Sequence, residues 1–335
     1  MKVAVLKQLK SPLELIDLEK PVPSPDEILV RIHCAALNRR DYWIQQGLYP
    51  KIELPAVLGS DGVGIVESVY HSSHEGMIGQ AVILNPNIHW GSNQRVQSPE
   101  YHILGMPTHG TLAQYVVISA ANVHPVPAHL SAESAAGLPL AGLTAWRALV
   151  SRGAVEANQD VLITGIGGGV ALMALSFALA HQANVWVTSG SEHKIQKAIQ
   201  MGAKGGVNYR NADWHKELNK LSGGFDLIID GAAGSGFPHL FDLAKLGGSI
   251  VVYGGTNGPI PEMNLGKLFW KQVDIKGSTM GSNRDFENML AFVRKHEILP
   301  VVDKVYAFDD VNDAFERLEE SDQFGKIVVR VRNDD

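Results

Sequence analysis

The stretch VLITGIGGGVALMALSFALA, residues 161–180, decides the fold. It carries no charge, and at about 20 residues it is long enough to span a bilayer. Four glycines, however, divide it into a β-branched run and a run rich in Ala and Leu. This division indicates a buried strand, a tight turn and a buried helix rather than a membrane span.

Strand and helix patterns alternate on the carboxyl side of this stretch. The apolar runs NVWVTSG, GGVNY, FDLIIDGA and SIVVYGGT are separated by helical patterns, the last of which is expected to run to Leu246. A further strand, VDIKGS, precedes a helix expected from about Asp285 to His296. Repeated units of this kind predict right-handed crossovers and a doubly wound parallel sheet. We therefore predict a Rossmann-type α/β domain over residues 124–296.

The chain before residue 124 has a different pattern. Short runs rich in Val and Ile, such as EILVRIHCAAL and GVGIVESV, are separated by Pro and Gly, which predicts a compact β-rich domain over residues 1–123. Ser131 is expected to cap the helix that follows the boundary. The tail, residues 297–335, resembles the opening region and is expected to fold back onto it. A length of 335 residues also favours two domains.

The composition argues against several classes of partner. The chain has 29 Lys and Arg against 35 Asp and Glu, a formal net charge of −6, and no basic run of the kind that attracts nucleic acid or anionic lipid. A single cysteine, Cys34, excludes an intramolecular disulfide and a zinc site of four thiolates. Lys2, Lys7 and Lys10 interrupt the apolar residues of the N-terminus, so no secretory signal is expected. These features predict a cytoplasmic globular protein.

The glycine-rich turn GIGGGVA is the strongest binding signal. It lies between a predicted strand and a predicted helix, where backbone amides and the helix dipole can hold a pyrophosphate. Its spelling departs from G-x-G-x-x-G, and a purely structural turn would need only one or two glycines. Four glycines in a strand–turn–helix unit favour nucleotide binding. The candidate contacts are Gly165, Gly167, Gly168, Gly169 and Val170.

The end of the second strand of this region indicates the type of dinucleotide. Sites specific for NADH usually place an acid there to bind the ribose 2′-hydroxyl, whereas this chain has Ser189, Gly190 and Ser191. The two hydroxyls, with Lys194 nearby, would stabilise a 2′-phosphate, so NADPH is the predicted cofactor. The alternative is that Ser189 only caps the next helix and that Lys194 is a solvated surface charge.

The order of these features resembles the medium-chain dehydrogenase/reductase superfamily, in particular its zinc-free quinone oxidoreductase branch. The resemblance covers essentially the whole chain and rests on the GIGGGVA turn and on the segments LNRRDYWIQQGLYP, PAVLGSDGVGIVESV, LPLAGLTAWRAL and GKIVVRV. It implies a GroES-like catalytic domain beside the Rossmann domain and a cleft at their junction. It also implies a homodimer formed by edge pairing, here through VDIKGS.

The resemblance also bears on metal. Zinc-dependent relatives carry ligands at positions that correspond to residues 38–41, 59–61 and 138–140, and this chain has neither cysteine nor histidine there. The segment 85–105 resembles the lobe that holds four zinc-binding cysteines, all missing here, and is expected to form a longer, mobile loop. His71 and His74 form an H-x-x-H, but in a polar turn, and are interpreted as surface residues. No metal is predicted, although His102 or His109 could contact a substrate.

Candidate site residues follow from the resemblance. Tyr49 is the first choice for a proton donor or substrate anchor, against the alternative that it only packs the cleft wall. Asn38, Asp41 and Tyr42 are further candidate donors. Asn38 is implied to contact the nicotinamide ribose, or else to form a turn. The implied cofactor contacts are Thr144, Tyr209 beside the adenosine 2′-phosphate, Gly254, Gly255 and Thr256 after a strand, and Lys326, which could equally be a solvated charge.

These observations predict an enzyme that reduces quinones or α,β-unsaturated carbonyl compounds with NADPH and without zinc. Without a Lewis acid, the oxidation of a simple alcohol lacks its main electrophile, whereas an activated double bond needs only hydrogen-bond donors near its carbonyl oxygen. Two alternatives remain at this stage. One is a zinc-free alcohol or ketone dehydrogenase, and the other is a protein that binds NADPH without turnover.

Overall fold

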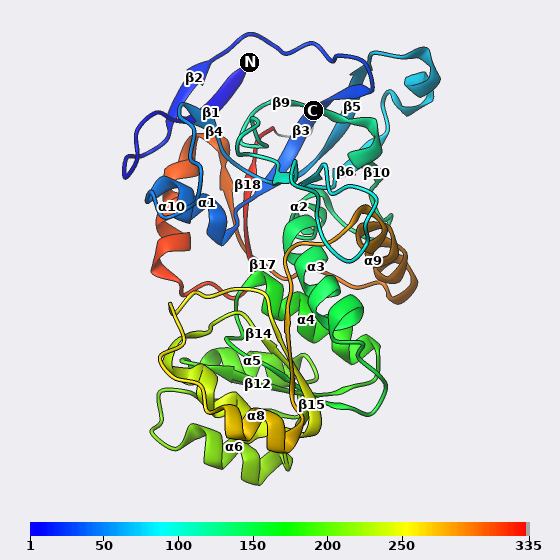
Figure 1. Ribbon diagram of the computed structural model, residues 1–335. Coiled ribbons are helices and arrows are strands. Elements are labelled where there is room, and N and C mark those ends of the chain that lie inside the picture. Colours follow the sequence, from blue (N-terminus) through cyan, green and yellow to red (C-terminus); the bar gives the residue numbers. More distant parts are fainter. Residues whose placement is uncertain (333–335) are drawn as a thin grey trace. The chain divides into compact units, whose positions relative to one another are not determined.

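The computed structural model describes residues 1–332, which form two compact units (Figure 1). The first, here called the β-rich unit, consists of Met1–Ala141 and Ser282–Asp335. The second, called the α/β unit, is the continuous segment Gly142–Gly281.

A six-stranded parallel sheet forms the centre of the α/β unit within the described residues. Its order is β13-β12-β11-β14-β15-β16, so the chain starts in the middle and winds outward in both directions. The strands are β11 (Asp160–Ile163), β12 (Asn184–Ser189), β13 (Gly205–Asn208), β14 (Phe225–Asp230), β15 (Ala244–Val252) and β16 (Asp274–Gly277). The helices are α4 (Gly169–Ala180), α5 (Glu192–Gln200), α6 (Trp214–Ser222), α7 (Leu240–Leu243), α8 (Leu265–Lys271) and the end of α3 (Pro139–Trp146), which continues as a π-helical turn, Arg147–Arg152.

The sequence of this sheet explains its burial. Strand β11 contributes Val161, Leu162 and Ile163, all fully buried, as expected for a central parallel strand covered on both faces. Helix α4 is apolar on nearly all sides and is buried accordingly. Within residues 1–332, no helix is both long enough and apolar enough to cross a bilayer, and α4 itself has 12 residues.

One predicted element is wrong. The helix expected to run to Leu246 is a 3₁₀ turn, Gly234–His239, followed by the single turn α7, and strand β15 already begins at Ala244. Ala244 pairs with Phe225 of β14, and the register shifts before Leu227 pairs with Ser249. Backbone pairing with a central strand outweighs the helix propensity of Ala, Lys and Leu.

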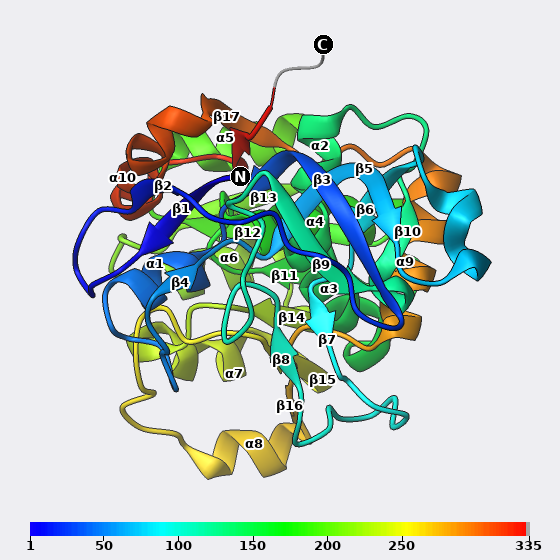
Figure 2. The same ribbon diagram turned by 90° about the horizontal axis from the view of Figure 1, so that it is seen from above.

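The β-rich unit contains two main sheets within the described residues (Figure 2). A three-stranded sheet has the order β2-β1-β4, from Glu14–Asp17, Lys2–Leu6 and Ala56–Val57. A seven-stranded sheet consists of β10 (Val123–Pro125), β6 (Ala81–Leu84), β5 (Asp61–Val69), β3 (Glu27–Ala36), β18 (Lys326–Arg330) and β17 (Val302–Ala307), with β9 (Tyr115–Ser119) also paired to β3. The helices are α1 (Arg39–Gln45), α2 (Ala132–Ala136), α9 (Asn283–His296) and α10 (Val311–Glu320). Short 3₁₀ turns are Ser72–Met77, Ala120–Asn122 and Phe308–Asp310. The predicted fold class, a β-rich domain plus a Rossmann-type parallel α/β domain, is confirmed.

The two compact units differ from the expected division at residues 123/124 and 296/297. Helix α9, expected in the Rossmann domain, groups with the β-rich unit because its first residue, Asn283, accepts hydrogen bonds from Asn85 at 3.3 Å and Asn87 at 3.0 Å. Phe286 of the same helix packs against His124 of β10. In the C-terminal tail, β18 pairs antiparallel with β3.

The segment 85–105 is folded around one aromatic side chain rather than extended as a long loop. Trp90 is 2% exposed, donates a hydrogen bond from its indole N–H to the carbonyl of Asn93 at 3.0 Å, and packs edge-on against Tyr101. Strands β7 (Asn87–Ile88) and β8 (His102–Ile103) pair at its base. The segment is therefore a small structured lobe of the β-rich unit.

Candidate active site

Helix α1 follows β3 closely, and its start is fixed by Asp41. The Asp41 carboxylate accepts the backbone N–H of Asn38 at 2.8 Å and that of Gly59 at 3.2 Å, which joins the helix to the chain before β5. Asp41 is fully buried, and burial raises the pKa of its carboxyl group. Both oxygens are used by backbone amides, so Asp41, a candidate donor, has the geometry of a positioning residue.

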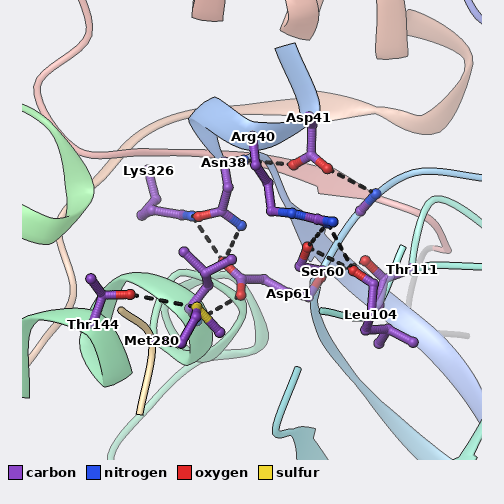
Figure 3. Close-up of polar contacts among 12 residues, drawn as sticks. Asn38, Arg40, Asp41, Ser60, Asp61, Leu104, Thr111, Thr144, Met280 and Lys326 are labelled. Atoms are coloured by element: carbon purple, nitrogen blue, oxygen red, sulfur yellow. Dashed lines mark hydrogen bonds and ion pairs between the residues drawn. The ribbon is translucent and has the colours of Figure 1, made fainter. Parts of the chain in front are cut away.

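Three side chains from distant parts of the β-rich unit meet beside α1 (Figure 3). The Lys326 ammonium donates to Asn38 Oδ1 at 2.6 Å and to Asp61 Oδ2 at 2.9 Å, and Asn38 Nδ2 donates to the same Asp61 oxygen at 2.9 Å. The second Asp61 oxygen accepts the backbone N–H of Leu140 at 2.8 Å. We call Asn38, Asp61 and Lys326 the buried triad.

The two charged side chains of the buried triad are almost entirely shielded from bulk solvent. The side chains of Lys326 and Asp61 are 5% and 0% exposed, so Lys326 is not the solvated charge that was one interpretation of the sequence. Lys326 opens β18 and Asp61 opens β5, on either side of the central strand β3. An ammonium has three N–H donors, of which the triad uses two.

Arg40 lies next to the triad on the buried side of α1. Its Nη1 donates to Ser60 Oγ at 2.6 Å and to the carbonyl of Leu104 at 3.0 Å (Figure 3). Its guanidinium carbon lies 5.1 Å from the centroid of the Tyr49 ring, a cation–π distance. Its Nε and Nη2 are buried and have no hydrogen-bond partner in the described chain. Sequence reasoning missed Arg40, although Ile44, four residues later on the same helix face, is buried.

The two candidate tyrosines are not brought together. Tyr49 is half-buried against the core of the β-rich unit, and its hydroxyl has no hydrogen-bond partner among residues 1–332. The hydroxyl of Tyr42 instead donates to Glu319 of α10 at 3.1 Å. Partial burial and this hydrogen bond raise the pKa of Tyr42. Of the two, only Tyr49 lies beside Arg40.

The glycine-rich turn of the α/β unit has the geometry of an anion site. Gly165 and Gly167 have φ of +66° and +126°, conformations that favour glycine. Gly168 is the N-cap of α4, which starts at Gly169 and continues with Val170. A Cβ built on Gly168 would meet no atom within 4 Å, so the helix N-terminus with its free N–H groups is open.

The carboxyl end of β12 carries a group that sequence reasoning missed. A Cβ on Gly190 would lie 2.9 Å from both Arg210 Nε and Tyr209 Oη, so these two side chains cover that glycine. Arg210 directly follows Tyr209 after β13, which was the available signal. Ser189 is buried, and its hydroxyl donates to the carbonyl of Ile166 at 3.3 Å.

Ser189, at the end of β12, does not cap the following helix, which was one interpretation of the sequence. The N-cap of α5 is Ser191 rather than Ser189, whose hydroxyl accepts the Ser191 N–H at 3.3 Å. Lys194 lies in the first turn of α5 and is half-buried. Ser189 therefore shapes the turn through backbone contacts.

The remaining candidates lie at the carboxyl edge of the sheet or on α3. Gly254, Gly255 and Thr256 are exposed just after β15, and Thr256 Oγ1 donates to the carbonyl of Gly231, just after β14, at 3.3 Å. This is the edge where open parallel sheets bind ligands. Thr144 is buried on α3, and its hydroxyl contacts the sulfur of Met280 at 3.6 Å.

No group of three His, Cys, Asp or Glu side chains in the described part of the chain is arranged to hold a metal ion. His71 is exposed and His74 half-exposed at a 3₁₀ turn. The ring of His102 packs edge-on against His89.

Two family models match the chain. "Alcohol dehydrogenase GroES-like domain" matches residues 24–128, and "Zinc-binding dehydrogenase" matches residues 169–295. The first match falls within the β-rich unit, and most of the second falls within the α/β unit.

Individual relatives cover the full length. The chain is 35% identical to "Zinc-type alcohol dehydrogenase-like protein YogA" of Leptosphaeria maculans, over 97% of this chain and 96% of the relative. It is 26% identical to the "Quinone oxidoreductase" of Homo sapiens, over 93% and 92%. A solved structure described as "NAD-dependent alcohol dehydrogenase" superposes with a TM-score of 0.93 at 36% identity, covering 99% of this chain and all of that one.

Proposed function

Since the chain belongs to the medium-chain dehydrogenase/reductase superfamily of oxidoreductases, we propose that it reduces quinones or α,β-unsaturated carbonyl compounds with NADPH and without zinc. The observation that carries this proposal is the buried triad. It provides a fixed positive charge, the Lys326 ammonium, from the chain itself.

The residues present do not fit a catalytic zinc ion. The regions that correspond to zinc ligands, residues 38–41, 59–61 and 138–140, hold no cysteine or histidine. Their two carboxylates are already used, Asp41 by backbone N–H groups and Asp61 by Lys326 and Asn38. The Lys326 ammonium also lies 2.6 Å from Asn38 Oδ1, and a cation there would repel a second one. These residues therefore do not favour zinc, and a metal takes no part in the proposed reaction.

The residues present do fit a dinucleotide. The open N-terminus of α4 at Gly168 offers N–H groups and the positive end of the helix dipole to a pyrophosphate. Gly254 to Thr256 lie at the ligand-binding edge of the same sheet. When bound, the reduced nicotinamide supplies a hydride.

The side chains of the β-rich unit supply the hydrogen-bond donors and the proton donor that the reduction of a conjugated carbonyl compound requires. As the double bond is reduced, negative charge collects on the carbonyl oxygen, and fixed donors stabilise it. Lys326 has one N–H that the triad does not use, and the unpartnered hydroxyl of Tyr49 is the proton donor of this proposal. Asp41 and Asn38 hold this end of α1 in place, and Tyr42, bound to Glu319, takes no part.

The preference for NADPH rests on the end of β12. No acid stands at residues 189–191, and the Arg210 side chain covers Gly190 together with Tyr209, which suits a 2′-phosphate. Arg210→Ala is expected to raise the KM for NADPH roughly 10- to 100-fold, the value of one or two charge-assisted hydrogen bonds, and to leave the KM for NADH unchanged. Initial rates with both cofactors check this.

Lys204→Ala removes an exposed cation before β13 and serves as the control, for which both KM values should stay as in the parent protein. Equal effects of Arg210→Ala on the two cofactors would contradict a 2′-phosphate contact. A parent protein that prefers NADH, the cofactor type named for one solved relative, would contradict the preference itself.

The proposal includes a homodimer joined at the edge strand β16. Helix α8, near this edge, exposes Phe269 and Trp270, which are 63% and 78% accessible, an unusual apolar surface for a monomer. Sedimentation should give about twice 36.3 kDa, and Trp270→Asp should shift the protein toward the monomer. Leu246→Asp changes an equally exposed apolar residue and should keep the dimer.

A cytoplasmic location also belongs to the proposal, since a chain with one cysteine forms no intramolecular disulfide.

A three-substrate assay tests the reaction. NADPH oxidation should be rapid with a quinone or an enone, should resist a zinc chelator, and should exceed any oxidation of a simple alcohol. A higher rate with the alcohol would favour a zinc-free alcohol dehydrogenase, in line with the names of several relatives. Thermal stabilisation by NADPH without turnover of any carbonyl compound would favour a binding protein.

A further inference from the structure

Arg40 presents two hydrogen-bond donors for which the described chain provides no acceptor. The residue is 7% exposed, and its Nε and Nη2 are both buried and unpartnered. These two nitrogens form one edge of the planar guanidinium and point the same way. Such an edge matches the two oxygens of a carboxylate.

The fold holds this edge in a fixed orientation. Nη1, on the opposite side of the group, is bound by Ser60 Oγ at 2.6 Å and by the carbonyl of Leu104 at 3.0 Å. The guanidinium carbon lies 5.1 Å from the centroid of the Tyr49 ring, a further contact that restrains the group. An oriented donor pair of this kind binds with little loss of side-chain entropy.

The nearby carboxylates do not meet this edge. Asp41 uses its oxygens to accept backbone N–H groups of Asn38 and Gly59, and Asp61 is bound by Lys326 and Asn38. The Arg40 charge acts on the Asp41 carboxyl group and opposes the rise in its pKa that burial causes, but no hydrogen bond joins Asp41 or Asp61 to the Nε–Nη2 edge of Arg40 in the described chain. A buried charged donor without an acceptor is costly, and an incoming carboxylate would remove that cost in a site of low dielectric.

We propose that the Nε–Nη2 edge of Arg40 binds a carboxylate of the substrate, so that the preferred substrates are conjugated ketones with a carboxylate on the far side of the double bond, the 4-oxo-2-enoates. This inference rests on the proposed function and names its substrate class. The alkene carbon β to the ketone gains a hydride from the reduced cofactor, and its neighbour gains a proton. The products are the saturated oxo acid and the oxidised cofactor, and the carboxylate is unchanged. Both nitrogens are shielded from solvent in this conformation, so entry of the ligand involves a local rearrangement.

A matched pair of substrates tests the proposal. 4-Oxopent-2-enoate and hex-3-ene-2,5-dione have the same shape around the double bond, but an acetyl group replaces the carboxylate in the second. The parent protein should reduce the first with a kcat/KM roughly 10- to 100-fold higher. Arg40→Lys keeps the charge but loses the two-donor edge, so the preference for 4-oxopent-2-enoate should disappear. The loss should come from a higher KM for this acid, whereas the kcat for the acid should change little.

Arg39→Lys is the matched control. Arg39 is the neighbouring arginine, bound to the carbonyl of Leu318 and to Ser321, and its replacement should leave the preference intact. Melting curves of both variants show whether they fold. A purely structural role for Arg40 would lower both rates equally, which would overturn the proposal.

Calorimetry with 4-oxopentanoate, the saturated product, separates this inference from the proposed function. If 4-oxopentanoate binds to the parent protein and to Arg39→Lys but not to Arg40→Lys, the carboxylate site is supported. This holds even where no substrate is reduced, and in that case only the proposed function fails. Reduction of a quinone, with no preference between the matched pair and no binding of 4-oxopentanoate, keeps the proposed function and overturns the role of Arg40.

Discussion

Lys326→Met is expected to lower the free energy of unfolding by about 3–5 kcal/mol, because it leaves the Asp61 carboxylate buried without its cation. The same change removes the positive charge of the proposed site, so turnover of an enone should fall roughly 10²- to 10³-fold. Chemical denaturation and steady-state kinetics measure the two effects separately.

The double variant Lys326→Met/Asp61→Asn separates structure from chemistry. It removes both charges, and most of the lost stability should return because no unpaired charge remains buried. Turnover should stay low, since the ammonium is still missing. A double variant that regains both stability and turnover would show that Lys326 serves only the fold.

The buried triad could not be derived from the sequence alone. Lys326 and Asp61 are 265 positions apart, and a lysine before a terminal strand is normally solvated. Only the pairing of β3 with both β5 and β18 brings them together. The resemblance placed Lys326 near the cofactor but gave no reason for its burial.

Local patterns predicted the α/β unit well. Strand and helix runs between β11 and β15 are short, strongly apolar or amphipathic, and separated by Gly, so each element follows from near neighbours. The exception is the region before Gly247, where pairing of Ala244 with Phe225 replaces a locally plausible helix. The glycine-rich turn could be identified from the sequence because its interpretation as a nucleotide site depends only on the strand before it and the helix after it.

Side-chain direction was the part that the sequence left open. Tyr42 and Tyr49 belong to one segment and look equivalent, but the hydroxyl of Tyr42 is bound by Glu319 of α10, which is 277 positions away. Arg40 was overlooked for a related reason. Two consecutive arginines suggest a solvated pair, whereas helix geometry turns Arg39 toward α10 and Arg40 toward Ser60.

Gly168→Asp is expected to raise the Kd for NADPH by about 100-fold or more while leaving the fold at least as stable. Gly168 has an extended backbone, φ −76° and ψ 156°, and open space around its Cβ, so a side chain fits without strain. An aspartate N-cap accepts a free N–H of the first turn and stabilises the helix by a few tenths of a kcal/mol relative to glycine, about the usual difference at this position. The same negative charge repels a pyrophosphate.

Gly168→Ser separates these two effects, because serine caps the helix equally well without the charge. Its Kd for NADPH should rise only about tenfold, through competition for one N–H group. Fluorescence titration gives the affinities and thermal melting the stabilities. The opposite result is that Gly168→Asp melts at or above the temperature of the parent protein and binds NADPH with the same affinity as the parent. That result would mean that the pyrophosphate does not bind at the start of α4. The glycine-rich turn would then be a packing device, and its four glycines would serve only the close approach of α4 to the sheet.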